Sequence, residues 1–218
     1  MPRIQFASLL RELLILVLGI LIAFLLNNWA QSRSERALEQ RYLQNLHDDL
    51  VADSLELATR LVDYQARRVI ANRVIGMIYN PNAPGRDSAA IFIFRDLQHE
   101  GPFVANQSTY NTLIYSGDFK LLRNFELRKR LAEHYHQYGE LEGENERSDH
   151  FIRSAVTPYM MNETTMANAR NGNAVDLSDP RLQNIVFASL GIMNYEAAAL
   201  RRALDRCREV LIQLNRAI

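Results

Sequence analysis

Two short groups of histidines and carboxylates are the places where this sequence could do metal or acid–base chemistry. They are His47-Asp48-Asp49 and Glu133-His134 with His136. On a helix, adjacent residues diverge by about 100° and residues two apart point to different faces, so neither group converges on one ion without help from another element. We interpret the first group as a solvated helix face and the second as the polar flank of a tyrosine-rich core. The sequence predicts no metal site and no catalytic site.

The single cysteine, Cys207, excludes an internal disulfide and any multi-cysteine metal site. It lies on an apolar helical period, where a buried and unreactive thiol is the usual outcome. The chain also has no glycine-rich phosphate loop, no nucleophile elbow and no zinc-ligand spacing. We therefore expect no cofactor, and we expect that the protein is not an enzyme.

The charges of the chain balance, with 25 Lys and Arg against 25 Asp and Glu. Binding to nucleic acid through a general electrostatic field needs a basic excess or a one-sided basic face. We therefore expect no nucleic-acid partner. Hydrophobic residues make up 48% of the 218 residues, which is typical of a chain that buries a core, and the length suits one ordinary domain beside an anchor.

The elements that would position any site begin with an apolar run near the N-terminus. Residues 13–26 carry no charge, but as a helix they span only about 21 Å, less than the roughly 30 Å hydrocarbon core of a bilayer. A helix from Phe6 to Trp29 spans about 36 Å, which suffices. The alternative is a cleaved signal peptide, and the lack of a small-residue cleavage site after the run argues against it. Residues 1–30 are therefore predicted to form one transmembrane anchor in the lipid bilayer.

Polar residues at both ends of this run are predicted to lie at the membrane interfaces. They are Arg11, Glu12, Asn27, Asn28 and Trp29. Long charged side chains can reach the headgroups, and tryptophan is typical of the interfacial belt. The two flanks carry nearly equal numbers of Lys and Arg, but a short positive N-terminus before an uncleaved apolar run resembles a signal anchor. We expect a single-pass protein of the bacterial inner membrane, with its soluble domain in the periplasm.

Residues 31–218 are predicted to form one helical extramembrane domain, which makes the fold class all-α. From Ser34 to about Tyr79 there is no proline, so a long helix continuous with the anchor is expected. Residues 80–85, rich in Asn, Pro and Gly, stop it. Its apolar residues recur near helical spacing: Leu38, Tyr42, Leu46, Leu50, Leu57, Leu61, Val62, Val69, Ile70, Val74 and Ile78.

Three shorter helices are predicted next. The first covers about 88–98, and the second covers about 107–116 and ends at Gly117 in a left-handed conformation. The third runs from about 124 to at least 147, with an end expected before Pro158. Together with the first long helix, these elements are expected to form a helical bundle.

A loop is predicted at about 162–179, and Asp179-Pro180 provides the N-cap and first-turn proline of an amphipathic C-terminal helix, 180–218. Its apolar residues follow the 3.5-residue period of coiled-coil packing. The candidate helix-packing seam consists of Leu190, Met193, Ala197, Leu200, Leu204, Cys207, Leu211 and Leu214. This seam packs either on the chain's own long helices, which we favour, or on a second copy.

Several motifs occur together and in order over about residues 9–140. They are the run from Glu12 to Trp29 ending GILIAFLLNNW, then Arg36, Tyr42-Leu43, Asn45-Leu46 and Asp49-Leu50, then Ser108-Thr109-Tyr110-Asn111-Thr112-Leu113, Ser116-Gly117, Leu121, Asn124 and Leu127-Arg128. This combination resembles an uncharacterised family of single-pass bacterial membrane proteins, a domain of unknown function common in Bacteroidetes. Arg11 departs from the glycine usual in that family, and nothing after about residue 150 matches it. The resemblance implies membrane location and a helical domain, but no activity.

The function that these features favour is a membrane-anchored helical interaction or scaffold protein. It would form homo-oligomers through the anchor or the C-terminal helix, or recruit a protein partner that the sequence does not identify. One alternative is a membrane-tethered sensor or ligand-binding domain, with residues 162–179 and the region from Tyr110 to Tyr138 framing a pocket. Another is a subunit of a homo-oligomeric pore, in which Glu12, Asn27 and Asn28 would line the axis.

Overall fold

The computed structural model describes residues 3–86, 89, 101, 103–163 and 175–218, with only the backbone described for residues 3–7 and for Glu163. Within these residues all regular secondary structure is helical, so the predicted all-α class is confirmed. The helix predicted at 88–98 lies, apart from Ala89, outside the described residues. Most of the loop predicted at 162–179 lies outside them too.

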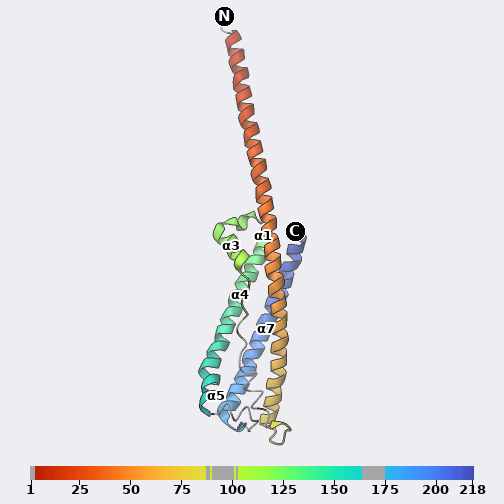
Figure 1. Ribbon diagram of the computed structural model, residues 1–218, viewed down its shortest axis with the longest axis vertical. Coiled ribbons are helices and arrows are strands. Elements are labelled where there is room, and N and C mark those ends of the chain that lie inside the picture. The colour runs from red at the N-terminus through yellow and green to blue at the C-terminus, as the bar shows by residue number, and fades with distance from the viewer. Residues whose placement is uncertain (1–2, 87–88, 90–100, 102, 164–174) are drawn as a thin grey trace.

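The first helix, α1, is unbroken from Arg3 to Tyr79 and is 77 residues long. Its proline-free sequence is rich in Leu, Ala, Arg, Glu and Gln, which are good helix formers. The first part projects far beyond the rest of the molecule, and the second part packs in a bundle (Figure 1). The predicted continuity of the apolar run with the first long helix is therefore confirmed.

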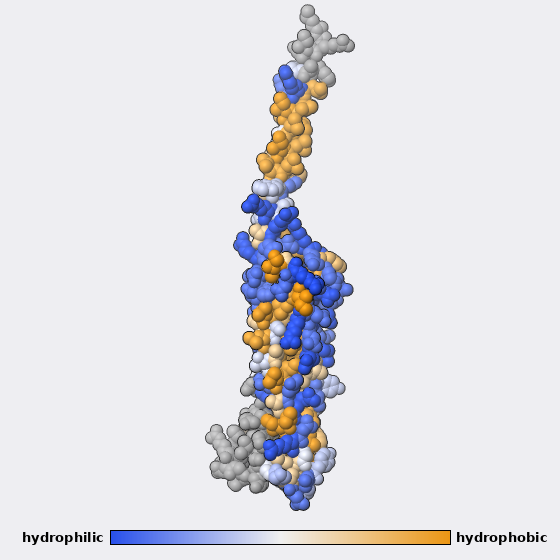
Figure 2. Space-filling view, turned by 90° about the vertical axis from the view of Figure 1, so that its right-hand side faces the viewer, coloured by the Kyte–Doolittle hydropathy of each residue, from blue (hydrophilic) through white to orange (hydrophobic). Residues whose placement is uncertain are grey.

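The projecting part of α1 is apolar and uncovered. We call residues 9–29 the apolar arm; every side chain in it is exposed. Among the described residues, α1 is the one helix that is long and apolar enough to cross a membrane. Figure 2 shows the arm as a nearly continuous hydrophobic sleeve, with hydrophilic side chains where it enters the bundle.

The bundle consists of the second half of α1, α4 (Phe125–Phe151) and α7 (Pro180–Ala217). In Figure 1, α1 and α4 run away from the arm and α7 returns, so the C-terminus lies near the point where the arm leaves the bundle. Leucines from all three helices are fully buried, and burying each contributes about 1.5–3 kcal/mol. They include Leu46, Leu50, Leu57, Leu127, Leu131, Leu182 and Leu214. This shared core sets which face of each helix points inward.

A short helical cap covers the arm-side end of the bundle (Figure 1). It consists of α3 (Ser108–Ser116) and the 3-10 turn η2 (Asp118–Leu121). Gly117 lies between them with φ +75°, a left-handed conformation that favours glycine, so the predicted terminator is confirmed.

Two polar contacts hold this cap on α1. The Tyr42 hydroxyl donates a hydrogen bond to the carboxylate of Asp118 at 2.8 Å. The backbone amide of Arg123 donates to the carboxylate of Glu39 at 2.7 Å, and the Arg123 guanidinium pairs with the same carboxylate at 3.4 Å. The cap is therefore fixed to α1 within a few turns of the apolar arm.

The third predicted helix is α4, which ends at Phe151, before Pro158 as predicted, but the chain stays helical beyond it. After α4 the chain forms a π turn, η3 (Ile152–Val156), and continues as α5 (Thr157–Glu163). A proline in a regular helix lacks the amide for the backbone bond and clashes with the carbonyl four residues earlier. A π turn just before Pro158 has a larger radius than an α-helical turn. It accommodates the proline ring, so the helical conformation continues beyond Pro158.

The start of α7 is as predicted. Asp179 is its N-cap, with the carboxylate accepting a hydrogen bond from the Arg181 amide at 2.8 Å, and Pro180 follows in the first turn. The C-terminal seam packs within the chain, against α1 and α4. Six of its eight residues are buried, whereas Leu190 and Leu211 are only partly buried.

The buried face of α7 is broader than the predicted seam, because α7 packs on two helices. Residues of α7 that the seam does not include are buried as well. They are Leu182, Ile185, Val186, Ser189, Glu196, Ala199, Ala203 and Val210. On α1 the correction is larger. Val62 and Val69, assigned to the apolar periodicity, are 64% and 70% exposed, because α4 and α7 cover only the opposite side of that helix.

Candidate functional site: buried polar groups and a cleft between α4 and α7

Ionisable side chains interrupt the apolar core at two levels of the bundle. The group nearer the arm, which we call the arm-side cluster, draws on all three long helices. Its members are Asp53 of α1, His134, Tyr135 and Tyr138 of α4, and Cys207 of α7. All five are buried. Burying polar groups is unfavourable unless they find partners.

Aromatic rings enclose the arm-side cluster. The His134 ring lies 4.2 Å from the Tyr138 ring, centre to centre, in an edge-on arrangement. Tyr135 stacks on Tyr110 of α3 at 4.0 Å. The Cys207 thiol donates a hydrogen bond to the Leu50 carbonyl at 3.3 Å. In the described residues, the aromatic side chains of Tyr110, Tyr135 and Tyr138 thus form part of a packed core.

Asp53 holds the segment that leads into α3. Its carboxylate accepts a hydrogen bond from the Asn106 amide at 3.0 Å. Close by along the chain, Phe103 packs edge-on against Tyr138 at 5.3 Å. Burial raises the pKa of Asp53, and the Asn106 amide opposes that shift. The carboxylate thus works as a clamp between α1 and the segment before α3.

The protonation states in the arm-side cluster do not favour nucleophilic chemistry. Burial raises the pKa of the Cys207 thiol to about 12. Burial, with a smaller effect from the positive charge of Arg206, lowers the pKa of His134 to about 4. At neutral pH the thiol is protonated and the imidazole is neutral, so no thiolate–imidazolium pair forms.

The second group, the distal cluster, surrounds a buried carboxylate farther from the arm. Glu196 of α7 is 3% exposed. Burial raises its pKa to about 7, and Glu144 adds to the shift. Hydrogen bonds with the hydroxyls of Tyr64 and Ser148 oppose it, as does the positive charge of Arg67. A carboxyl group with a pKa near 7 changes charge within the physiological range.

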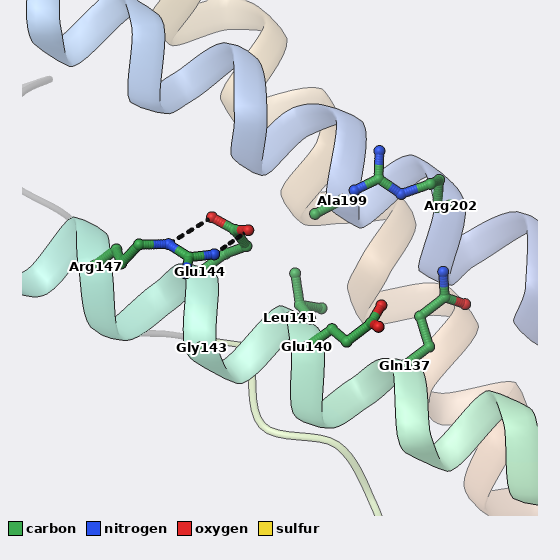
Figure 3. Close-up of a pocket in the computed structure, with 8 residues that line it drawn as sticks. All are labelled: Gln137, Glu140, Leu141, Gly143, Glu144, Arg147, Ala199 and Arg202. Carbon is green, nitrogen blue, oxygen red and sulfur yellow. Dashed lines mark hydrogen bonds and ion pairs between the residues drawn. The ribbon is translucent and has the colours of Figure 1, made fainter.

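A polar cleft of about 390 Å³ lies between α4 and α7 (Figure 3). Its wall is Gln137, Glu140, Leu141, Gly143, Glu144 and Arg147 of α4, with Ala199 and Arg202 of α7. Gly143 and Ala199 lack bulky side chains and leave the space open. Arg202 and Gln137 extend from opposite helices, while Glu144 and Arg147 form an ion pair. A wall of this kind can bind a small polar molecule or a peptide through hydrogen bonds and ion pairs.

The cleft and the distal cluster share a charged residue. Glu144 lines the cleft, and its negative charge also acts on Glu196. A positive group bound beside Glu144 would therefore favour the ionised form of Glu196. The arrangement can couple binding at the surface to the charge of a buried group, but it offers no nucleophile.

The structure places the residues predicted at the membrane interfaces on the apolar arm. Arg11, Glu12, Asn27, Asn28 and Trp29 are all exposed. The Arg33 guanidinium lies 5.7 Å from the centre of the Trp29 ring, over its face. One turn beyond Trp29, a cation thus lies over the face of its ring.

The histidine groups do not converge on an ion. His47 and Asp48 contact each other at 3.1 Å, with Asp48 exposed. His134 is buried whereas His136 is exposed, so the two lie on different faces as predicted. In the ranges that the structure describes, no group of three or more His, Cys, Asp or Glu residues could hold a metal ion.

The sequence analysis did not identify Asp53 and Glu196 as buried ionisable residues, although the position of each in the apolar periodicity indicates burial. Asp53 lies in the 3–4 spacing of Leu46, Leu50 and Leu57, and Glu196 lies three residues after Met193 in the C-terminal helix. A charged residue on the core face of a helix is unusual, because an uncompensated charge is unstable in a core. That departure from the pattern could have marked both residues.

The chain was also compared with known proteins, and no protein-family model, curated protein or solved structure matches it.

Proposed function

We propose that this protein is a membrane-anchored helical interaction protein of the bacterial inner membrane, with its bundle in the periplasm. One observation carries the proposal: a single helix, α1, contains both the apolar arm and one of the three core helices. A flexible tether would let the bundle move freely relative to the bilayer. A continuous helix instead fixes the distance and the tilt between them.

The length of this connection follows from helix geometry. Trp29 marks the predicted interface, and Leu43 is the first buried residue of the bundle. Fourteen residues of helix span about 21 Å. Since the α3 cap reaches back along α1 through Glu39, it fills part of that distance. The bundle would thus stand just outside the headgroup layer.

The partner-binding surface must lie on the outside of the bundle. The C-terminal seam is occupied by α1 and α4, and so it is not available to a partner. The polar cleft between α4 and α7 is a concave surface on the outside of the bundle. Its mixed charges suit a peptide or protein segment that also carries both signs.

Two experiments test this proposal in the full chain. A topology reporter fused after Ile218 reports which side of the membrane the bundle faces, and a cytoplasmic result would overturn the assignment to the periplasm. A photo-crosslinking residue at Gln137 or Arg202 should give discrete adducts in cells. The same residue at Arg153, exposed on the distal turn η3, should not. Equal labelling at all three positions, or no adduct at any, would refute a cleft-directed partner.

A sensor is the second candidate function, and one observation favours it. Glu196 titrates near pH 7 behind a cleft whose wall includes Glu144. Binding of a small cation would shift that titration and, with it, the stability of the bundle. Screening a panel of amines and cationic peptides by thermal unfolding of wild type and Glu144→Gln tests this. A stabilising ligand whose effect is lost in the variant supports a sensor, and a ligand effect unchanged by the variant refutes it.

A further inference from the structure

The face of α1 that points away from the bundle carries an apolar stripe where a polar surface is expected. Its large residues are well exposed: Leu55 by 71%, Val62 by 64% and Val69 by 70%. With the smaller residues between them they form a row spaced alternately by three and four. We call this row the outer stripe: Ala52, Leu55, Thr59, Val62, Ala66 and Val69, all exposed. An amphipathic bundle helix normally reserves this face for charged residues.

The outer stripe has the pattern of a helix-pairing surface. A 3–4 spacing keeps one row of residues facing a partner helix over several turns. The stripe carries no charge from Ala52 to Val69, over about 26 Å of helix, and Asp48 and Arg73 follow at its two ends on the same spacing. Figure 2, which views the bundle from the α1 side, shows hydrophobic side chains recurring below the arm.

We propose that the outer stripe pairs two copies of this chain side by side, with both helices running in the same direction. The inference names the partner of the proposed interaction function and rests on membrane anchoring through the same helix. Because the arm and the stripe belong to one rigid helix, every copy in a membrane presents the stripe in the same direction and at the same height. Two stripes therefore meet in register around a two-fold axis perpendicular to the bilayer.

The area of the stripe indicates why pairing needs the membrane. Six small and medium side chains on one helix face form a narrow patch, on the scale of the roughly 300–600 Å² of the largest apolar patch on a typical monomer. Two such patches would bury about 600–1,200 Å², which is at or below the lower limit of about 1,200 Å² for stable complexes in solution. Anchoring in a shared bilayer raises the effective concentration and fixes the orientation, which compensates for the small area. The contact is thus expected in membranes and not for the isolated bundle.

The geometry of the stripe favours a close parallel pair. Ala52 and Ala66 alternate with the larger residues, so two backbones can approach at those levels. An ion pair on the same helix, Arg60 with Glu56 at 2.9 Å, is made within α1 and does not require a partner. Leu55, Val62 and Val69 would then each contact the same residue of the second copy, as in a parallel coiled coil.

Cysteine cross-linking of the full chain in liposomes tests this arrangement. Val62→Cys and Val69→Cys should form inter-chain disulfides on mild oxidation, because equivalent residues face each other in a parallel pair in register. Tyr195→Cys, 74% exposed on α7, is the matched control and should stay reduced. The native Cys207 is fully buried and should not react. Equal cross-linking at Tyr195 and at the stripe, or none at either, would overturn the proposal.

A charge variant provides the second measurement. Val62→Glu would place two carboxylates at the centre of the pair, so the dimer fraction measured by energy transfer between labelled copies should fall about tenfold or more. Ile212→Glu, on α7 and 53% exposed, should leave it unchanged. Circular dichroism should show both variants fully folded, since both sites are on the surface.

The outcomes separate this inference from the proposed function. If the stripe variants leave the dimer fraction unchanged while adducts at Gln137 persist, the stripe proposal is wrong and the interaction function stands. If the reporter places the bundle elsewhere but cross-linking at Val62 persists, pairing is correct and the periplasmic assignment is wrong. If the same oxidation is carried out in cell membranes, a Val62→Cys chain that is trapped only on a different protein would also overturn the pairing of identical copies.

Discussion

Replacing Glu196 by glutamine should make the bundle more stable at alkaline pH and leave it nearly unchanged at acid pH. The buried carboxyl group has a pKa of about 7 against its ordinary 4.5. Below pH 4.5 it is protonated in both the folded and the unfolded chain. Between pH 4.5 and 7 only the unfolded chain releases the proton, so the wild type loses stability as pH rises. Above pH 7 that loss is complete.

The magnitude follows from the difference of about 2.5 pH units. At 1.36 kcal/mol per unit, ionisation of Glu196 destabilises the folded chain by about 3 kcal/mol at pH 8.5. Glutamine keeps the shape and removes the titration, but it also loses the attraction to Arg67. We therefore expect a gain of about 2 kcal/mol at pH 8.5, or a rise of about 4–8 °C in Tm. At pH 4.5 the gain should be below about 0.5 kcal/mol.

The assay must compare variant with wild type at each pH, because His134 titrates in the opposite sense. Its pKa is about 4 against an ordinary 6.5, so its neutral form stabilises the fold above pH 6.5 and that stability is lost as pH falls toward 4. The two effects offset each other in the raw profile between pH 4.5 and 6.5. Urea unfolding of the full chain in nanodiscs at several pH values gives the difference in the free energy of unfolding between the variant and the wild type.

A matched control is Glu140→Gln, an exposed carboxylate on the wall of the same cleft. It should change the free energy of unfolding by less than about 0.5 kcal/mol at either pH. If Glu196→Gln gave the same gain at pH 4.5 and pH 8.5, the effect would not be ionisation. If the variant were less stable than wild type at pH 8.5, the hydrogen bonds with Tyr64 and Ser148 would outweigh the burial of charge, and our reasoning would be refuted.

Three further outcomes are expected. His134→Leu should stabilise the chain by about 2 kcal/mol at pH 5, with a smaller gain at pH 8, because at pH 5 the wild-type imidazole binds a proton in the unfolded chain but not in the folded chain. An equal gain at both pH values in chemical unfolding would contradict this. Leu204→Ala should lower the free energy of unfolding by about 2–4 kcal/mol, since the side chain is 2% exposed. The mass measured by light scattering should equal that of the wild type. A change in mass would mean that the seam lies between chains. Asp53→Ala removes the acceptor of the hydrogen bond from the Asn106 amide. The rate of hydrogen exchange at that amide should therefore rise about tenfold or more, while exchange rates within α4 stay constant. An unchanged rate at Asn106 would show that Asp53 does not hold this segment on α1.

The sequence predicted where the helices begin and end better than it predicted which side of each helix is buried. The limits of α1 and α7 follow from local signals, namely the absence of proline before the turn at residues 80–85 and the cap at Asp179. The inward face of α1 did not follow from them. Apolar residues occur on both sides of that helix, and periodicity alone cannot show which side the other helices cover. Val62 and Val69 were therefore assigned to the core when they lie outside it.

The candidate site depended even more on tertiary packing. Asp53, Glu196 and Tyr138 come from three different helices, and nothing local brings them to the same core. Their pKa values are set mainly by burial, which is a property of the assembled bundle. Pro158 shows the same limit at the level of the backbone. The residue predicted a break, but the neighbouring π turn, which no residue type specifies, let the helix continue.

The order of α1 and α7 in the chain has a consequence for biosynthesis. α7 covers the inward face of α1, yet about 140 residues separate the end of α1 from the end of α7. At roughly 5–20 residues per second, a ribosome needs on the order of 10 s to make that stretch. During this interval the leucine row from Leu43 to Leu61 has no α7 to cover it. Nascent chains should therefore need protection by a chaperone, and chains that stop before α7 should be removed by proteolysis.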